Sequence, residues 1–229
     1  MVKHNIFQMA AIATLSALYD QLWGFKPSFI RALIEEKGAI KGIFWFAQYM
    51  PRYEKILSRW GPLRTHSLAT MMALLNGCGY STHGHAYALQ LHYLQQRDCL
   101  FPLTDQAIAA LSNLSDAEKI SRLEQALIEA ELGSEVFTLR RAVELRANPT
   151  LAMSDRDRDL RHLIGTLQGI CTACIPANLR LQQAQDAITK NRALRDRYAQ
   201  YRASQQPALA NVAPTPAITV LNPEDIVND

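Results

Sequence analysis

The sequence has almost no segments that are typical of β-strands, because apolar residues rarely alternate with polar ones. It also lacks an uninterrupted apolar run of about 18 residues, so we expect no membrane span and no membrane partner. A Gly-rich phosphate-binding loop, a Gly-x-Ser-x-Gly motif and a His-Glu-x-x-His motif are all missing. These absences argue against a β protein and against several common classes of enzyme.

Cysteine is scarce, with only Cys78, Cys99, Cys171 and Cys174 in 229 residues. A small secreted protein held together by disulfides would contain more, so we expect a cytoplasmic protein with reduced thiols. The formal net charge is only +3, which indicates no strong tendency to bind nucleic acid. The apolar N-terminal stretch is interrupted by Gln8 and has no clean cleavage site, which favours an amphipathic helix over a signal peptide.

The sequence does contain helical periodicity in nearly every segment, and 48% of its residues are hydrophobic. This pattern predicts an all-α, single-domain bundle of about eight to ten helices over residues 1–203. The Pro- and Ala-rich residues 204–229 are predicted to be a flexible tail. Ser115 and Glu118 form a capping-box pattern at the start of one helix. Pro51 is expected to kink or divide another helix, and a long helix capped by Ser154 is expected to bend at Pro176 and continue to about residue 203.

One polar island interrupts the apolar helical pattern, at residues 76–89 with the sequence NGCGYSTHGHAYAL. Cys78, Ser81 and His85 are spaced by three and four residues, so they would share one face of a helix. His83 would point elsewhere, so a zinc site made by neighbouring histidines of this helix is not expected.

Residue spacing leaves two interpretations of this island open. A thiol at a helix N-terminus has a lowered pKa, and His85 could donate or accept a proton beside a reactive Cys78. Alternatively, Cys78 is a small buried apolar residue and His85 is hydrogen-bonded to the surrounding structure.

Residues 63–94 resemble the core of the alkylhydroperoxidase D-like, or carboxymuconolactone decarboxylase, family. The redox members of that family carry a glutamate, eleven residues, Cys-x-x-Cys, three residues and a histidine. This chain has His66, eleven residues, Cys78 and Ser81 at the ends of Cys-Gly-Tyr-Ser, three residues and His85. The resemblance implies a bundle of the alkylhydroperoxidase D-like type that assembles into a homo-oligomer through helical faces.

The resemblance also implies roles for individual residues. Cys78 stands at the resolving cysteine, Ser81 at the attacking cysteine and His66 at the relay glutamate, while Tyr80 supplies the aromatic residue inside the motif. A serine hydroxyl cannot follow the oxidation steps of a cysteine sulfur. We therefore expect weak or absent classical peroxidase turnover, and the sequence leaves open whether the protein is an enzyme.

A second dithiol lies in the long C-terminal helix, where Cys171 and Cys174 form a Cys-x-x-Cys pair. Aligned with the first island, Asp159 falls twelve residues before Cys171, so residues 155–200 could be a degenerate second repeat. In the alternative interpretation the two cysteines simply line the apolar face of the helix. No further ligand pair for a zinc site is apparent near them.

Three functions remain compatible with the sequence. The favoured one is a thiol-linked oxidoreductase related to peroxidases. It would act on a peroxide or another small molecule through Cys78 and His85, with Cys171 and Cys174 as further candidates, and a dithiol protein would reduce it. The second is a lactone decarboxylase-type enzyme in which His66 and His85 form the acid/base pair. The third is a non-catalytic family member that binds a ligand or a partner. None of the three requires a cofactor or a metal ion.

Overall fold

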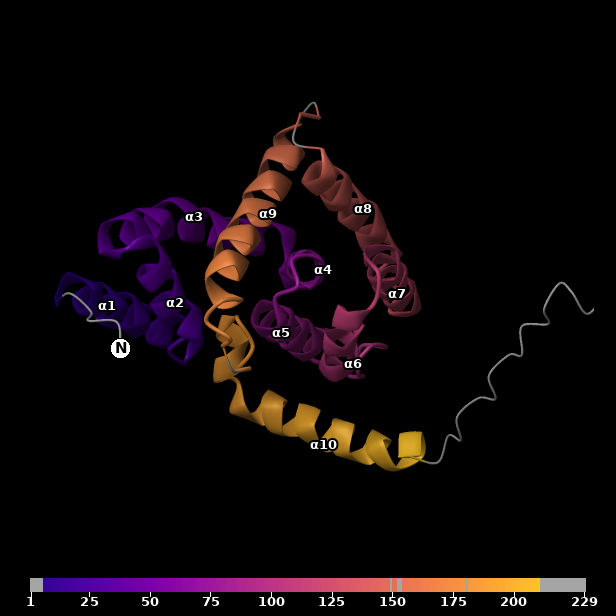
Figure 1. Cartoon of the computed structure of the whole chain (residues 1–229). Helices are drawn as coiled ribbons and strands as arrows, with labels where there is room; N and C mark the ends of the chain where they lie inside the picture. Colours follow the sequence, from indigo (N-terminus) through magenta and orange to yellow (C-terminus); the bar gives the residue numbers. More distant parts are fainter. Residues whose placement is uncertain (1–5, 149, 152–153, 180, 211–229) are drawn as a thin grey trace, which may run out of the picture.

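The computed structural model describes residues 6–148, 150–151, 154–179 and 181–210, and over these residues all regular secondary structure is helical (Figure 1). The predicted all-α class is therefore confirmed. Across the described part of the chain, no helix is both long and apolar enough to cross a membrane. The elements are α1 (Ile6–Trp23), α2 (Ser28–Lys37), α3 (Ala39–Trp60), α4 (Pro62–Leu75), α5 (Gly79–Arg97), α6 (Asp105–Ala110), the 3-10 helix η1 (Leu111–Asn113), α7 (Asp116–Glu129), α8 (Gly133–Ala147), α9 (Asp155–Cys174), the 3-10 helix η2 (Ala187–Lys190) and α10 (Arg192–Ala210).

The helices α4 and α5 form the centre of the bundle, and α9 crosses both of them (Figure 1). On one side α9 also contacts α2 and α3, and on the other side α8 covers α4 and α9. Every residue of α4 from Thr65 to Leu75 is buried. A helix that is buried all round is typical of the core of a bundle, so the side chains of α4 from Thr65 to Leu75 lie away from bulk solvent.

Two of the helix starts that the sequence suggests are capping boxes in the structure. The Ser115 side chain accepts a hydrogen bond from the Glu118 backbone at the start of α7, and Ser154 does the same for Asp157 at the start of α9. Pro51, in contrast, does not divide α3, which is continuous from Ala39 to Trp60. The buried face that α3 packs against the core, which includes Met50 on one side of the proline and Ile56 on the other, holds the two halves together.

The long C-terminal helix ends earlier than the periodicity predicts. The last helical residue of α9 is Cys174, and the chain then turns through Asn178, which has a left-handed φ of 45°. Pro176 lacks the backbone N–H that a continuing helix would need. A new helix, α10, begins only at Arg192, and the connecting segment crosses the first half of α5.

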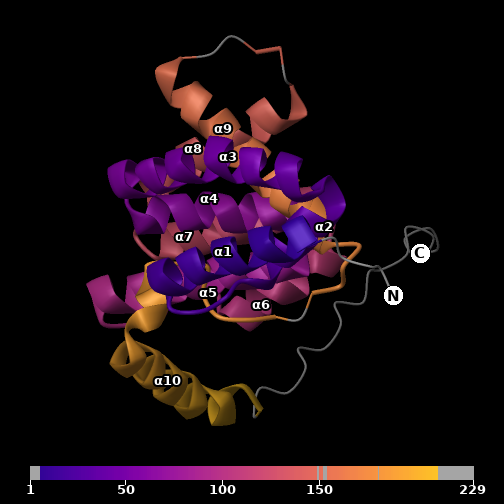
Figure 2. The same cartoon turned by 90° about the vertical axis from the view of Figure 1, so that its left-hand side faces the viewer.

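The helix α10 lies at the edge of the bundle, below α5 and α6 (Figure 2). It is attached through Asp105 at the start of α6, which accepts a hydrogen bond of 2.7 Å from the Tyr198 hydroxyl and pairs with Arg202 at 3.1 Å. α10 extends to Ala210, past the predicted domain end at residue 203, so the first part of the predicted tail is helical. The rest of that predicted tail, residues 211–229, is outside the described residues.

Candidate functional site

The turn between α4 and α5 fixes the position of Cys78. Gly77 has a φ of 70°, a conformation that glycine adopts without strain. The N–H of Cys78 donates to the Ala73 carbonyl at 3.0 Å, and the N–H of Gly77 donates to the Leu74 carbonyl at 3.0 Å. This pair of hydrogen bonds is the Schellman motif, which ends α4. The next residue, Cys78, is the N-cap of α5, at the positive end of the helix dipole.

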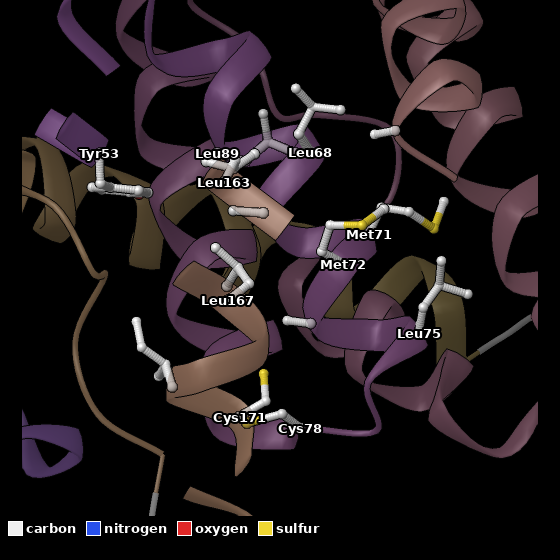
Figure 3. Packing of buried hydrophobic residues seen from close by; sticks show 14 of the residues in the cluster. Tyr53, Leu68, Met71, Met72, Leu75, Cys78, Leu89, Leu163, Leu167 and Cys171 are labelled. Atoms are coloured by element: carbon white, nitrogen blue, oxygen red, sulfur yellow. The ribbon is translucent and has the colours of Figure 1, made fainter. Parts of the chain in front are cut away.

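The last turn of α9 brings two further thiols to Cys78. The Cys78 sulfur is within hydrogen-bonding reach of the Cys171 and Cys174 sulfurs, and Ser81 Oγ is 3.5 Å from Cys78 Sγ. Figure 3 shows Cys78 and Cys171 side by side at one end of the core. Each of the three cysteines is 2% exposed and none is in a disulfide. We call Cys78, Cys171 and Cys174 the thiol cluster. The cluster brings together the Cys-Gly-Tyr-Ser motif at the start of α5 and the Cys-x-x-Cys motif at the end of α9. The sequence alone could assign these motifs only to separate helices.

A pocket of about 270 Å³ leads from the surface to the thiol cluster. Cys78, Cys174 and Tyr80 are its buried residues. Its exposed residues are Gly77, Gly79, Ile175, Asn178 and Leu181. Two of the three sulfur-bearing side chains therefore line a space that a small solute can enter.

The three thiols have very different acidities. Hydrogen bonds from the Cys171 and Cys174 thiols lower the pKa of Cys78 well below that of a free thiol, and contacts with Ser81 add to this effect. The pKa values of Cys171 and Cys174 are raised, because both act as protonated donors to Cys78 and both are buried. Of the three thiols, Cys78 is therefore the one whose ionised form its neighbours favour.

His85 lies one turn of α5 beyond Ser81 and is 2% exposed. Its Nδ1 is 3.3 Å from Nδ1 of His66, so another histidine rather than a backbone carbonyl holds this ring. Burial lowers the pKa of both histidines, and the His66 charge helps to lower that of His85 to about 3. The charges of Asp186 and, to a smaller extent, Cys78 oppose this lowering of the His85 pKa, so the ring lies within electrostatic range of the thiol cluster.

The structure adds two residues that the sequence did not single out, His92 and Asp186. His66 Nε2 is 3.0 Å from Asp186 Oδ2, and His92 Nε2 is 3.1 Å from Asp186 Oδ1. The second contact does not have the angles of a well-formed hydrogen bond. We call His66, His85, His92 and Asp186 the histidine–aspartate cluster. Burial raises the pKa of Asp186, but contacts with His66 and His92 outweigh burial and hold this pKa below its usual range.

Two residues of α3 face the same cluster. Burial and the charge of Asp186 raise the pKa of Glu54, and burial followed by the charges of Glu54 and Asp186 raises that of Tyr53. The Tyr53 hydroxyl and Glu54 Oε1 are buried and have no hydrogen-bond partner among the described residues. The cluster therefore has polar neighbours whose hydrogen-bonding capacity the protein itself does not fill.

A close approach between α5 and the segment after α9 delivers Asp186. The N–H of Gln185 donates to the Gly84 carbonyl at 3.0 Å, and a Cβ at Gly84 would lie only 2.5 Å from Gln185 Cγ. His83, which points away from His85 as its spacing predicts, donates from Nε2 to the Gln182 carbonyl at 3.1 Å. The absence of a side chain at Gly84 is thus what allows the segment to lie flat on α5.

Of the other two predicted site residues, Tyr80 lies at the pocket and Asp159 does not. Tyr80 lines the pocket, and its hydroxyl donates to Gln182 Oε1 at 2.9 Å. Asp159 pairs with Arg52 at 3.2 Å and with Arg59, and it is about 18 Å along α9 from Cys171. Asp159 is therefore not part of the site that contains the thiols.

The spacing of the histidines in α5 could have indicated His92 as a site residue, whereas no pattern in the sequence indicates Asp186. His92 follows His85 by seven residues, which is two helical turns, so both rings lie on one face of α5. Asp186 reaches the cluster through a non-helical segment whose path depends on contacts with α5 that are remote in sequence.

In comparisons with known proteins, no family model, no curated protein and no solved structure matches this chain. The resemblance of residues 63–94 to the alkylhydroperoxidase D-like family thus stays a prediction that rests on the motif. The function has to be argued from the geometry of the site.

Proposed function

We propose that the protein is a thiol-dependent oxidoreductase that forms and breaks a disulfide between Cys78 and a cysteine of α9. One observation carries this proposal: three cysteines from two distant segments lie close enough to exchange hydrogen bonds, and two of them, Cys78 and Cys174, are among the residues that line a pocket. The motif resemblance points in the same direction. It suggests a small hydroperoxide as the oxidant and a dithiol protein as the reductant.

The proposed cycle begins with the Cys78 thiolate, which attacks the terminal oxygen of the hydroperoxide. The O–O bond breaks, a proton passes to the leaving alkoxide, and Cys78 becomes a sulfenic acid while the hydroperoxide is reduced to an alcohol. The Cys174 thiol then attacks the Cys78 sulfur, the S–O bond breaks, and water leaves. An external dithiol reduces the resulting disulfide by exchange.

This assignment changes the roles that the motif alone implies. Ser81 stands at the attacking position of the motif, so the residues of α5 alone cannot form a disulfide. In our proposal the second thiol comes from α9 instead, and the lowered pKa of Cys78 supports its role as the attacking sulfur. We expect slow turnover, because both thiols are buried and a peroxide reaches them only through the small pocket.

The test is a peroxide-consumption assay with dithiothreitol as reductant. We expect Cys78→Ser to abolish turnover and Cys174→Ser to reduce it strongly. Cys99→Ser is the matched control, since Cys99 is exposed and free, and it should behave like the wild type. Turnover that survives both Cys78→Ser and Cys174→Ser would rule out the proposed thiol chemistry.

No observation favours the two alternatives over this proposal. His66 and His85 touch each other, as a decarboxylase with this acid/base pair would need, but both rings are buried and neither lines the pocket. A non-catalytic ligand-binding role would be indicated if peroxide changed the mass of no cysteine. The expected cytoplasmic location, the peroxide substrate and the dithiol partner remain predictions.

A further inference from the structure

We propose that His66, His92 and Asp186 bind one divalent transition-metal ion, of the zinc or ferrous iron class, in the core between α4, α5 and the start of η2. This site is separate from the thiol cluster, and the inference does not rest on the proposed function.

The spacing of the three side chains is close to that of ligands around one ion. Zinc binds histidine nitrogens and carboxylate oxygens at about 2.0 to 2.2 Å, which separates tetrahedral ligands by about 3.3 Å. In the structure Asp186 oxygens are 3.0 Å from His66 Nε2 and 3.1 Å from His92 Nε2. One ligand atom from each of the three residues lies within 4.8 Å of the others. Only small side-chain adjustments would be needed to bind an ion.

The contact between His92 and Asp186 is itself better explained by shared ligation. His92 Nε2 approaches the carboxylate to 3.1 Å, yet it lacks the geometry of a hydrogen bond. Two ligands of one ion come this close without pointing at each other, because their lone pairs are directed at the metal. A histidine kept only to neutralise the carboxylate would be expected to donate a well-aligned hydrogen bond.

A second, independent observation comes from α3. The Tyr53 side chain is 2% exposed and its hydroxyl has no hydrogen-bond partner among the described residues, and the same holds for the buried Glu54 Oε1. The charge of Asp186 acts on both groups, and the Glu54 carboxyl has a hydrogen bond from Trp23 that leaves Oε1 unpaired. Unsatisfied buried polar atoms are costly, so groups of this kind are expected to have a use. A fourth ligand of the ion, such as water, would satisfy them.

The residues around the three ligands hold them in orientation. The second nitrogen of His66, Nδ1, is 3.3 Å from His85 Nδ1. His85 therefore fixes the orientation of the His66 ring while His66 Nε2 faces the ion. Asp186 Oδ1 accepts a hydrogen bond of 2.6 Å from the Ile188 backbone. Metal-binding histidines and carboxylates are commonly fixed by such outer hydrogen bonds.

The chemistry of the ligands indicates which ions fit. Two imidazoles and one carboxylate suit Zn²⁺ or Fe²⁺, with one or more positions left for other ligands. Calcium and magnesium prefer sites made of oxygen ligands, which this cluster does not offer.

The experiment uses Co²⁺ as the probe, titrated into the purified full-length protein and followed by visible absorption and equilibrium dialysis. We expect one bound Co²⁺ per chain and no sulfur-to-cobalt charge-transfer band. His92→Ala and Asp186→Asn should each weaken binding by at least about 10-fold. His162→Ala is the matched control, because His162 is held by the Tyr49 carbonyl at 2.8 Å outside the cluster, and it should bind like the wild type.

Two controls separate this site from the thiols and from misfolding. The triple variant Cys78→Ser, Cys171→Ser, Cys174→Ser should keep its Co²⁺ affinity. Co²⁺ should raise the melting temperature of the wild type but not that of His92→Ala. The proposal is overturned if Co²⁺ does not bind, if both ligand variants bind it as well as the wild type, or if a charge-transfer band shows that sulfur holds it. The peroxide assay tests the proposed function independently of each of these results.

Discussion

Among single residues, the proposed thiol chemistry depends on which of the three sulfurs of the thiol cluster is ionised. A free cysteine has a pKa of about 8.5, so its thiolate fraction falls about tenfold for each pH unit below that value. Cys78 has a lowered pKa, whereas the hydrogen bonds that Cys171 and Cys174 donate to Cys78, and then burial, raise the pKa values of these two thiols. Cys78 should therefore remain a thiolate in slightly acidic solution, while its neighbours stay protonated.

The first prediction follows from this difference in acidity. The rate at which iodoacetamide alkylates Cys78 should change by less than about twofold between about pH 8 and about pH 6, whereas a free thiol should slow by more than about tenfold. Peptide mass spectrometry after timed quenching measures the rate, with N-acetylcysteine as the reference. A Cys78 profile that follows the reference would show that its pKa is not lowered.

At the scale of helices and turns, the site depends on how closely α5 approaches the segment that carries Asp186. A Cβ at Gly84 would lie 2.5 Å from Gln185 Cγ, whereas a Cβ at Gly133, at the start of α8, would meet no atom within 4 Å. The two glycines thus differ in whether an added methyl group must displace a neighbour.

We predict that Gly84→Ala lowers the free energy of unfolding by about 1 to 3 kcal/mol, because the added methyl group overpacks this contact. It should also weaken Co²⁺ binding, since Asp186 follows Gln185 directly. Gly133→Ala should change stability by less than about 1 kcal/mol and leave Co²⁺ binding unaltered. Urea unfolding and Co²⁺ titration check both outcomes, and equal effects of the two variants would contradict the account.

The helix α9 offers a second test at this scale, because its cap and its thiols are at opposite ends, about 30 Å apart. Ser154→Ala removes the capping hydrogen bond and should cost about 1 kcal/mol of unfolding free energy. The alkylation rate of Cys78 should not change. Ser134→Ala, which replaces an exposed serine that caps no helix, is the control and should be close to neutral. A Ser154→Ala variant as stable as this control would show that the cap contributes nothing.

Local patterns predicted the elements, but they did not predict how the elements meet. The sequence predicts the capping box at Ser115 and the helix cap at Ser154, because each cap depends on residues three positions apart. The end of α9 was predicted too late, because the apolar periodicity does not show that the chain turns back over α5. The same non-local path explains why Asp186 could not be foreseen, and why Cys171 and Cys174 could not be assigned to Cys78.

At the scale of the whole molecule, the predicted homo-oligomer stays a prediction. Large apolar side chains are exposed on α3, with Ile40 72% and Phe44 70% exposed, and Ile40 lines a surface pocket together with Phe7 at the start of α1. Exposed apolar patches of this kind commonly mark protein–protein contacts. The motif resemblance implies that the partner is a second copy of this chain.

If this face joins two copies, Phe44→Glu should convert the oligomer into a monomer, because a charge would be buried in an apolar interface. Phe137→Glu is the matched control, since Phe137 is 76% exposed on α8, and it should keep the mass of the wild type. Light scattering after size exclusion gives the mass. A monomeric wild type, or an oligomer that Phe44→Glu leaves intact, would contradict the prediction.

Disulfide mapping after treatment with one equivalent of hydrogen peroxide shows directly whether Cys78 reacts with a thiol of α9. Trypsin places Cys78 on residues 65–97, Cys99 on residues 98–119, and Cys171 with Cys174 on residues 162–180. We predict a disulfide-linked pair of peptides 65–97 and 162–180, lost in Cys78→Ser, with Cys99 still free. Three reduced cysteines in this cluster, or a disulfide confined to peptide 162–180, would contradict the account.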